Sequence, residues 1–222
     1  SVMKGMAAAR KERKSKEASM PSVTRRAGKM YSFKNGLGTL TATLASRLRT
    51  APRLSNLLHR LSPSQSGWHL EVEGGESLDA EVVVLTCPAH QQAKLLEPLD
   101  PVLGEQIGAI PYNRVAVVAV GYRRKDVAHS LDGFGYLSPQ RCRRDVLGVQ
   151  WCSSIYPQRA PSDSVLVRAM CGGWNRGEMV VWSDEQLLGA VQDELTKTIG
   201  VSAAPTFTEI IRWQRAIPQY HL

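Results

Sequence analysis

Apolar and polar residues alternate with two different periods along this chain of 222 residues. Short runs rich in β-branched residues, bounded by Gly, Pro, Asn or Ser, predict strands. The run at 80–86 is apolar at almost every position, which is typical of a strand buried on both faces. For the leucine-rich run at 54–61 a helix stays open. The predicted strands span residues 54–61, 68–72, 80–86, 114–122 and 206–213, with three short apolar runs between 131 and 173.

Apolar residues spaced three and four apart predict helices between these strands. The best defined helix follows Ser183, an N-cap residue with Gln186 at capping-box spacing, and it ends at Gly200. The predicted helices span residues 2–20, 39–49, 89–96, 101–110 and 184–199.

The charge is concentrated at one end of the chain. Residues 1–34 hold ten Lys or Arg and two acidic residues, whereas the other 18 basic and 18 acidic residues cancel. A basic end attracts nucleic acid or an anionic membrane surface. The segment has few aromatic residues and no nucleic-acid motif, so we expect no nucleic-acid partner, and membrane-surface attraction stays open.

Composition limits where in the cell the protein can be expected and whether its cysteines form disulfides. No apolar run approaches the roughly 18 residues needed to cross a bilayer, and no secretory signal follows the basic N-terminus. We therefore expect a cytoplasmic protein, with peripheral membrane contact open. The four cysteines form no CxxC pair, which favours buried free thiols, although a disulfide stays open.

Little chemistry is visible in the residues alone. The histidines match no catalytic triad, no Walker A or GxSxG motif occurs, and the GxG pieces at 36–38 and 133–135 lack a third glycine. Any difficult chemistry would therefore belong to a cofactor.

Glycines beside aromatic residues mark the stretch from Leu131 to Gly173. They occur in the sequences GFGY at 133–136 and GGW at 172–174. Glycine in a strand allows close approach of another backbone or of a flat ligand. Bulges and turns in a sheet are the plainer explanation, and a sheet face shaped for a large planar molecule is the sharper one.

Several segments together resemble the middle portion of the protoporphyrinogen oxidases, within the FAD-dependent amine-oxidase-like superfamily. The resemblance covers nearly the whole chain in order, and its most specific part is LDGFGYLSP. The matching segments are SFKNGLGTLTATLASRL (32–48), DAEVVVLTCPAH (79–90), IPYNRVAVVAVGYRR (110–124), LDGFGYLSP (131–139), VLGVQWCSSIYPQRAP (146–161) and RWQRAIPQY (212–220).

This resemblance implies an α+β (mixed α/β) fold built from parts of three domains. Residues 1–31 would end a helical, membrane-facing domain and form a basic linker. Residues 32–87 would belong to a partial FAD-binding domain. Residues 88–222 would form a substrate-binding domain with a mixed, largely antiparallel sheet and flanking helices.

The resemblance also implies positions for the substrate. Leu137, Gln150 and Met170 match residues that line the tetrapyrrole cavity in relatives, and Phe134 and Gly135 lie next to that wall. Gln150 departs from the aliphatic residue often found there. Core packing is the alternative for all of these residues.

Two further positions concern the cofactor. Leu58 matches a strand position whose backbone meets the adenine end of FAD, with core packing as the alternative. The lysine that amine oxidases of the superfamily carry near the flavin falls at Val117, which favours a porphyrinogen oxidase. The glycine-rich FAD fingerprint, the arginine that meets a substrate propionate and the C-terminal FAD segment have no match, so this chain should hold FAD poorly.

The resulting prediction is FAD-dependent oxidation of protoporphyrinogen IX to protoporphyrin IX, with oxygen as acceptor, in heme or chlorophyll synthesis. A coproporphyrinogen III oxidase of the same fold is one alternative. A non-catalytic basic interaction module that no longer binds FAD is another. The porphyrinogen is the predicted partner, and a homodimer stays open.

Overall fold

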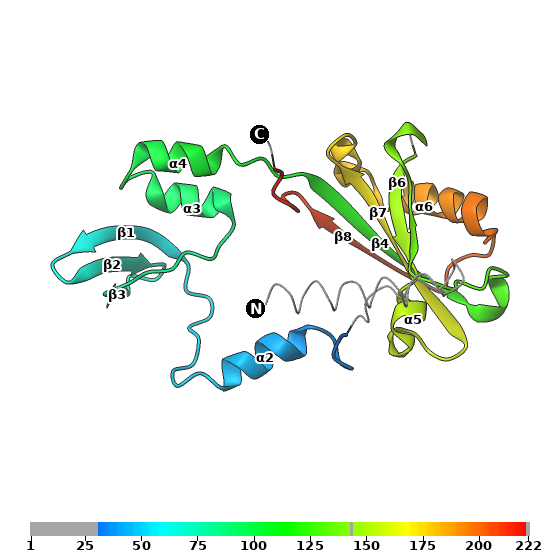
Figure 1. Cartoon of the computed structure of the whole chain (residues 1–222), viewed down its shortest axis with the longest axis horizontal. Coiled ribbons are helices and arrows are strands. Elements are labelled where there is room, and N and C mark those ends of the chain that lie inside the picture. Colours follow the sequence, from blue (N-terminus) through cyan, green and yellow to red (C-terminus); the bar gives the residue numbers. More distant parts are fainter. Residues whose placement is uncertain (1–30, 143, 221–222) are drawn as a thin grey trace, which may run out of the picture. The chain divides into compact units, whose positions relative to one another are not determined.

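The computed structural model describes residues 31–142 and 144–220 (Figure 1). The chain divides into two compact units, residues 1–53 and 54–222. The predicted helix at 2–20 lies outside the described residues. The domain boundaries proposed at 31 and 87 refer to the whole protein and stay a prediction.

The first unit contributes one described helix, α2 (Gly38–Ser46). It confirms the helix predicted at 39–49, except that it ends three residues earlier. Its leucines, including Leu40 and Leu44, are exposed, and none of its residues is buried. No helix in the described part of the chain is long and apolar enough to cross a membrane.

The second unit begins with a small antiparallel sheet and a pair of helices. The sheet has the order β1-β2-β3, and α3 packs against α4. Asp100 caps α4 by accepting a hydrogen bond from the Leu103 amide at 3.0 Å, and Pro101 follows it at the first helical position. The bounds are β1 (Leu58–Ser64), β2 (Gly67–Val72), β3 (Ser77–Ala80), α3 (Ala89–Leu96) and α4 (Pro101–Gly108).

The apolar run at 80–86 is not a buried strand, and that prediction is wrong. β3 ends at Ala80, and Val82 and Val84 are 76% and 77% exposed. A strand buried on both faces needs neighbours on its edges and layers above and below. Residues 81–86 pair with no strand in the described part of the chain, so their apolar side chains lack that cover.

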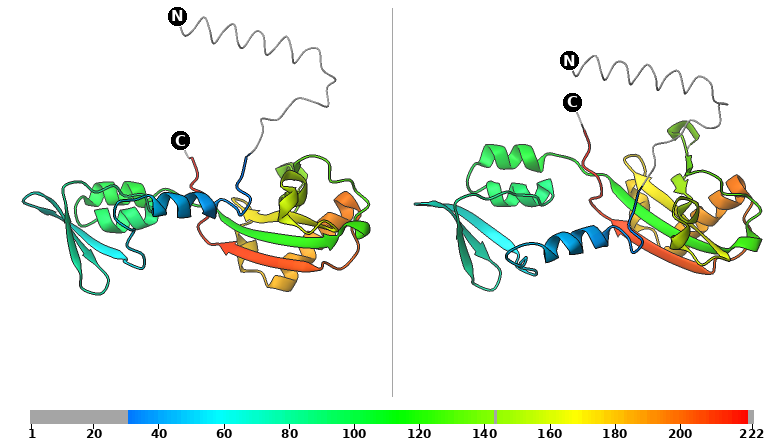
Figure 2. Two further views of the ribbon diagram at one scale, coloured as in Figure 1. Left: turned by 90° about the horizontal axis from the view of Figure 1, so that it is seen from below. Right: turned by 60° about the horizontal axis from the view of Figure 1, so that its bottom comes forward.

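The larger sheet has the strand order β5-β6-β7-β4-β8, and all neighbouring strands are antiparallel. Figure 2 shows the strands β4 and β8 of this sheet side by side. Mixed helices and antiparallel sheets confirm the predicted α+β class. The bounds are β4 (Arg114–Arg123), β5 (Gly135–Leu137), β6 (Val146–Gln150), α5 (Cys152–Ile155), β7 (Ser164–Gly173), α6 (Asp184–Ile199) and β8 (Phe207–Trp213), with short 3-10 helices η1 (Arg124–Asp126), η2 (Gln140–Cys142), η3 (Pro157–Arg159) and η4 (Gly177–Val181).

Helix α6 begins and ends as its sequence predicts. The Ser183 hydroxyl accepts from the Gln186 amide at 3.2 Å, and the Gln186 side chain accepts from the Ser183 amide at 3.0 Å. Gly200 closes the helix with a left-handed φ of 71°.

Helix α6 packs on one face of the large sheet, and this contact forms the core of the second unit. Alternate strand side chains point to opposite faces, so every second residue of β4 and β7 meets the helix. The fully buried members include Val118, Val120, Val167 and Ala169 on the strands and Leu187, Val191 and Leu195 on the helix.

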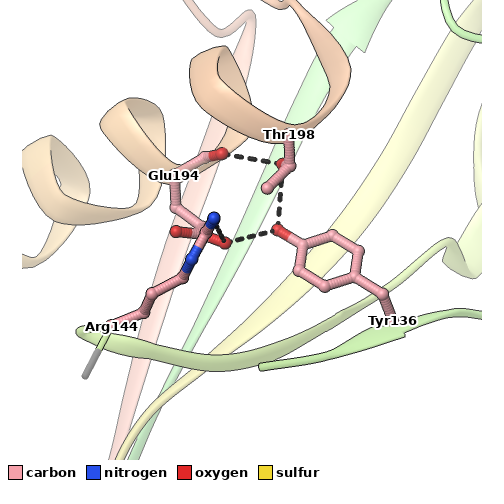
Figure 3. A network of polar contacts seen from close by, with 4 residues as sticks. All are labelled: Tyr136, Arg144, Glu194 and Thr198. Carbon is pink, nitrogen blue, oxygen red and sulfur yellow. Dashed lines mark hydrogen bonds and ion pairs between the residues drawn. The ribbon is translucent and has the colours of Figure 1, made fainter. Parts of the chain in front are cut away.

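A polar network crosses the same face (Figure 3). The Tyr136 hydroxyl donates to the Glu194 carboxylate at 3.0 Å and lies 3.0 Å from the Thr198 hydroxyl. Arg144 forms an ion pair with the buried Glu194 at 2.8 Å. Burial is the main cause that raises the pKa of Tyr136 to about 12. The network holds β5 against α6 through Tyr136. Its neighbours in β5, Gly135 and Leu137, therefore lie on the opposite face of the sheet.

The four cysteines are free thiols. The prediction that they are buried is correct for Cys171, whose pKa burial raises to about 12. It is wrong for Cys142, which is exposed in the short 3-10 helix η2. Cys87 and Cys152 are half-buried.

Candidate functional site: the open face of the large sheet

The face of the large sheet that points away from α6 carries the predicted substrate-binding residues. Residues paired across antiparallel strands lie on the same face, so the strand register assigns each side chain. We call this surface the open face. Its side chains are half-buried or exposed, and they are Val117, Ala119, Gly135, Leu137, Gln150, Leu166, Arg168, Met170, Phe207, Glu209, Ile211 and Trp213.

One apolar row crosses all five strands. Leu137 pairs with Gly148, which pairs with Met170, followed by Val117 and Ile211. An added Cβ at Gly148 would lie 2.8 Å from the Leu137 side chain, so glycine lets that leucine lie across β6. Leu137 is 78% exposed, and Met170 is half-buried. The structure thus brings two of the predicted cavity residues into one apolar strip.

A second row, next to the first, is polar. It contains Gly135, Gln150, Arg168, Ala119 and Glu209 in register. The Arg168 guanidinium donates a hydrogen bond to the side-chain oxygen of Gln150. Gln150, the third predicted cavity residue, therefore lies on the open face, but its amide contacts an arginine.

Arg168 is the residue of this face that the sequence reasoning missed. The signal was present, because strict alternation along β7 places residues 166, 168 and 170 on one side. Arg168 does not lie at the position where the family carries its propionate-binding arginine, so the family resemblance does not point to it.

The glycines at 135 and 172 allow neighbouring strands of the sheet to approach closely. An added Cβ would lie 2.0 Å from the Val149 carbonyl oxygen at Gly135 and 2.8 Å from the Arg114 carbonyl oxygen at Gly172. Both residues have positive φ, at 137° and 98°. The close approach of neighbouring strands is thus sufficient to explain both glycines, which agrees with the plainer interpretation.

Phe134 lies beside the open face, just before β5. Its carbonyl oxygen accepts a hydrogen bond from the Trp151 amide at 3.0 Å, and its side chain is about half exposed. It therefore lies next in sequence to the row that contains Gly135 and Gln150, and its backbone is hydrogen-bonded to the buried Trp151.

Helix α5 borders the open face at β7. The Ser153 hydroxyl accepts a hydrogen bond from the Leu166 amide at 3.1 Å. Burial raises the pKa of the Cys152 thiol, and the positive charge of Arg168 offsets part of that rise. Cys152 is thus held mainly as a neutral thiol, and Ser153 is already engaged by the strand.

Metal-binding clusters and histidine pairs could supply chemistry away from α5, but among the described residues none lies on the open face. No cluster of three or more His, Cys, Asp or Glu side chains suited to a metal occurs among residues 31–142 and 144–220. His69 pairs with Asp79 at 2.8 Å and His59 with Glu71 at 3.7 Å, both on the small sheet. Neither histidine pair lies on the open face.

The region assigned to the cofactor does not form a flavin site by itself. Leu58 opens β1, pairs with Val72 and is half-buried, with a register shift before Arg60. Residues 54–87 form the small sheet and the exposed run after it, with no helix N-terminus to receive a phosphate. These residues alone do not fit FAD, and no reaction step is assigned through them.

Comparison with protein families shows which family this chain belongs to. Residues 6–222 match the family described as flavin containing amine oxidoreductase. The chain belongs to this family. A flavin is therefore the cofactor class of its relatives, and the resemblance found in the sequence is confirmed.

Curated relatives in this family include oxidases of porphyrinogens. The chain is 27% identical over 196 residues to coproporphyrinogen III oxidase of Bacillus subtilis (strain 168), covering 88% of this chain and 41% of that protein. It is 30% identical over 201 residues to the chloroplastic protoporphyrinogen oxidase of Oryza sativa subsp. japonica, covering 85% and 38%. The chain thus spans about two fifths of the length of these relatives.

Solved structures of the family share the fold. A protein from Exiguobacterium sp. 255-15, provisionally named protoporphyrinogen oxidase, matches with a TM-score of 0.73 and 26% identity over 89% of this chain and 43% of its own. Putrescine oxidase bound to putrescine matches with a TM-score of 0.64 and 16% identity over 83% and 41%, which shows the fold alone.

Proposed function

We propose that the whole protein oxidises protoporphyrinogen IX to protoporphyrin IX, with FAD as cofactor and oxygen as electron acceptor. The open face of the large sheet is the wall against which the macrocycle lies. The observation that carries this proposal is the shared face of Leu137, Gln150 and Met170, which come from three different strands.

The physical basis of binding is the burial of apolar area. Covering about 100 Å² of apolar side chain releases roughly 2.5 kcal/mol. Leu137, Met170 and Val117 form a continuous strip, and Ile211 extends it to the edge strand β8. A flat ring covers such a strip more fully than a flexible chain does, so the surface favours a planar macrocycle.

The role of these residues is positioning. The sheet is rigid because α6 fills its other face, so a ring on the open face is held in one plane. The oxidation itself belongs to the cofactor. Val117 stands where the amine oxidases of the superfamily carry a lysine, and it lies in the apolar strip, which favours a porphyrinogen over an amine.

Coproporphyrinogen III is the second candidate substrate, and two observations favour it. Relatives from Bacillus subtilis and Propionibacterium freudenreichii are named coproporphyrinogen III oxidase. Arg168 also places a positive charge on the open face, where it can meet a carboxylate. Coproporphyrinogen carries more carboxylates than protoporphyrinogen does.

An assay of the full-length protein with each porphyrinogen tests the proposal. We expect porphyrin fluorescence to grow with time, oxygen to be consumed, and flavin absorbance in the purified protein. Faster turnover of coproporphyrinogen III would select the second substrate. Inactivity on both would contradict the proposal, and a colourless protein without flavin would favour the non-catalytic interaction module.

The remaining expectations are part of the same proposal. We propose a cytoplasmic protein, with the basic N-terminal segment held at an anionic membrane surface and with no nucleic-acid partner. Relatives from tobacco carry the names chloroplastic and mitochondrial. Sedimentation with anionic vesicles, and with neutral vesicles as control, tests the membrane contact. Light scattering tests whether the protein is a homodimer.

A further inference from the structure

Arg168 occupies an unusual place in the middle of the open face. It lies on β7, between β6 and β4, with Leu166 and Met170 on either side of it along the same face. It is exposed, whereas its strand neighbours Val167 and Ala169 are fully buried on the other face. Any flat ligand that covers Met170 and Leu166 also covers this guanidinium.

The charge of Arg168 has no carboxylate partner among residues 31–142 and 144–220. Several other arginines of the unit do have one, although Arg124 donates to backbone carbonyl oxygens instead. Arg123, at the end of the same face, pairs with Asp163 at 3.5 Å, and Arg144 pairs with Glu194. Arg168 instead donates to the neutral amide of Gln150, which uses part of its five N–H donors.

These observations set a condition on the ligand. Covering an arginine with an apolar ring removes its charge from water, which is costly unless an anion pairs with it. A carboxylate satisfies the planar fork of a guanidinium with two parallel hydrogen bonds. The apolar strip suits the ring of a tetrapyrrole, and the adjacent polar row suits one of its carboxylate arms.

We propose that Arg168 binds a carboxylate of the tetrapyrrole and that Gln150 is a positioning residue that holds the guanidinium over the open face. This inference rests on the proposed function. It also gives Gln150 a different role from the direct ring contact expected for it, since its side-chain oxygen faces the arginine.

Fluorescence titration of the full-length protein tests the inference, with coproporphyrin III and its fully esterified methyl ester as probes. We expect Arg168→Gln to weaken binding of the free acid about tenfold, as for one lost charge-assisted hydrogen bond of ~1.4 kcal/mol. Binding of the ester should stay unchanged. Gln150→Leu should weaken the acid by a smaller factor and leave the ester unchanged.

Matched variants separate the outcomes. Arg123→Gln removes an exposed arginine from the same face and should bind both probes like the wild type. Arg168→Lys keeps the charge but not the fork, so its affinity for the acid should fall between those of wild type and Arg168→Gln. Equal affinity of wild type and Arg168→Gln for the acid, or an equal loss with the ester, overturns this inference alone. A wild-type chain that binds neither probe overturns the proposed function as well.

Discussion

The two faces of the large sheet are built from the same strands but differ in how far their side chains are buried. On the α6 face, strand side chains pack with helix side chains in one core cluster, and Val118, Val120 and Val167 are essentially inaccessible to water. On the open face, Val117, Ala119 and Leu166 are the immediate sequence neighbours of these residues, yet they remain partly accessible. Alternation along β4 and β7 thus separates the surface that forms the core from the surface that we propose binds the ligand.

The difference also extends to polar groups. The α6 face holds one buried carboxylate, Glu194, and satisfies it with Arg144 and Tyr136. The open face holds Arg168, which has only an amide partner among the described residues. A polar group that serves stability is paired within the fold, whereas one that serves binding keeps donors free for a ligand.

The largest expected effect compares one leucine from each face. Leu195→Ala empties a fully buried site on α6 and should lower the free energy of unfolding by about 2–5 kcal/mol. Leu137→Ala removes the same atoms from an exposed site and should change it by less than about 0.5 kcal/mol. Urea denaturation of both variants measures the difference. Equal destabilisation would show that the open face is also core.

A smaller effect is expected from the buried carboxylate. Glu194→Ala removes the carboxylate partner of Arg144 and leaves the Tyr136 hydroxyl with Thr198 alone, which should cost about 1–3 kcal/mol of unfolding free energy. Glu209→Ala makes the same substitution at an exposed position of the open face and serves as the control. Calorimetric unfolding of the two variants should separate them, and a more stable Glu194→Ala would contradict the assigned network.

Alkaline pH should weaken the α6 face through Tyr136. Burial raises the pKa of this phenol from its ordinary value of 10.0 to about 12 in the folded chain. Between these values the unfolded chain has lost a proton that the folded chain retains, so stability is full below pH 10 and falls as the pH rises toward 12. Tyr136→Phe should flatten this part of the pH profile.

The size of that slope is bounded. One full proton corresponds to about 1.4 kcal/mol per pH unit, and the phenol contributes less because it is only half-buried. Comparing the slopes of wild type and Tyr136→Phe isolates the tyrosine from Cys171, whose raised pKa acts in the same direction. Identical slopes would remove Tyr136 as the source.

The smallest expected effect reports the position of Arg168. Its charge lowers the pKa of the neighbouring Cys152 thiol, although burial raises that pKa overall. Arg168→Gln should therefore shift the pH profile of Cys152 alkylation to higher pH. The exposed Cys142 should react with the reagent at the same rate in both proteins and provides the internal control. An unchanged Cys152 profile would place the guanidinium elsewhere.

Local patterns predicted much of this fold because the signals involved are themselves local. The capping box at Ser183, the closing Gly200 and the alternation of the strand at 114–122 depend on neighbouring residues, and all three are observed. The run at 80–86 has an equally strong pattern, but burial of a strand depends on partners elsewhere. Its exposed valines show that composition alone does not supply those partners.

Only some residues of the open face could likewise be predicted from the sequence. Family resemblance led to Leu137, Gln150 and Met170, and the strand register confirms that they share a face, while their roles stay a prediction. Arg168 was missed because its meaning depends on register with Gln150, which lies 18 positions away in the chain. Register across non-adjacent segments follows from the assembled sheet and is invisible to local periodicity.

Two methionines allow the most direct test, because Met170 lies on the open face and the fully buried Met179 lies on the α6 side. A bound porphyrin has a large ring current, which shifts the NMR signal of a nearby methyl group. With ¹³C-methyl methionine and protoporphyrin IX, we expect the Met170 signal, assigned through Met170→Leu, to move strongly and the Met179 signal to stay in place. Movement of Met179 with an unshifted Met170 would contradict binding at the open face.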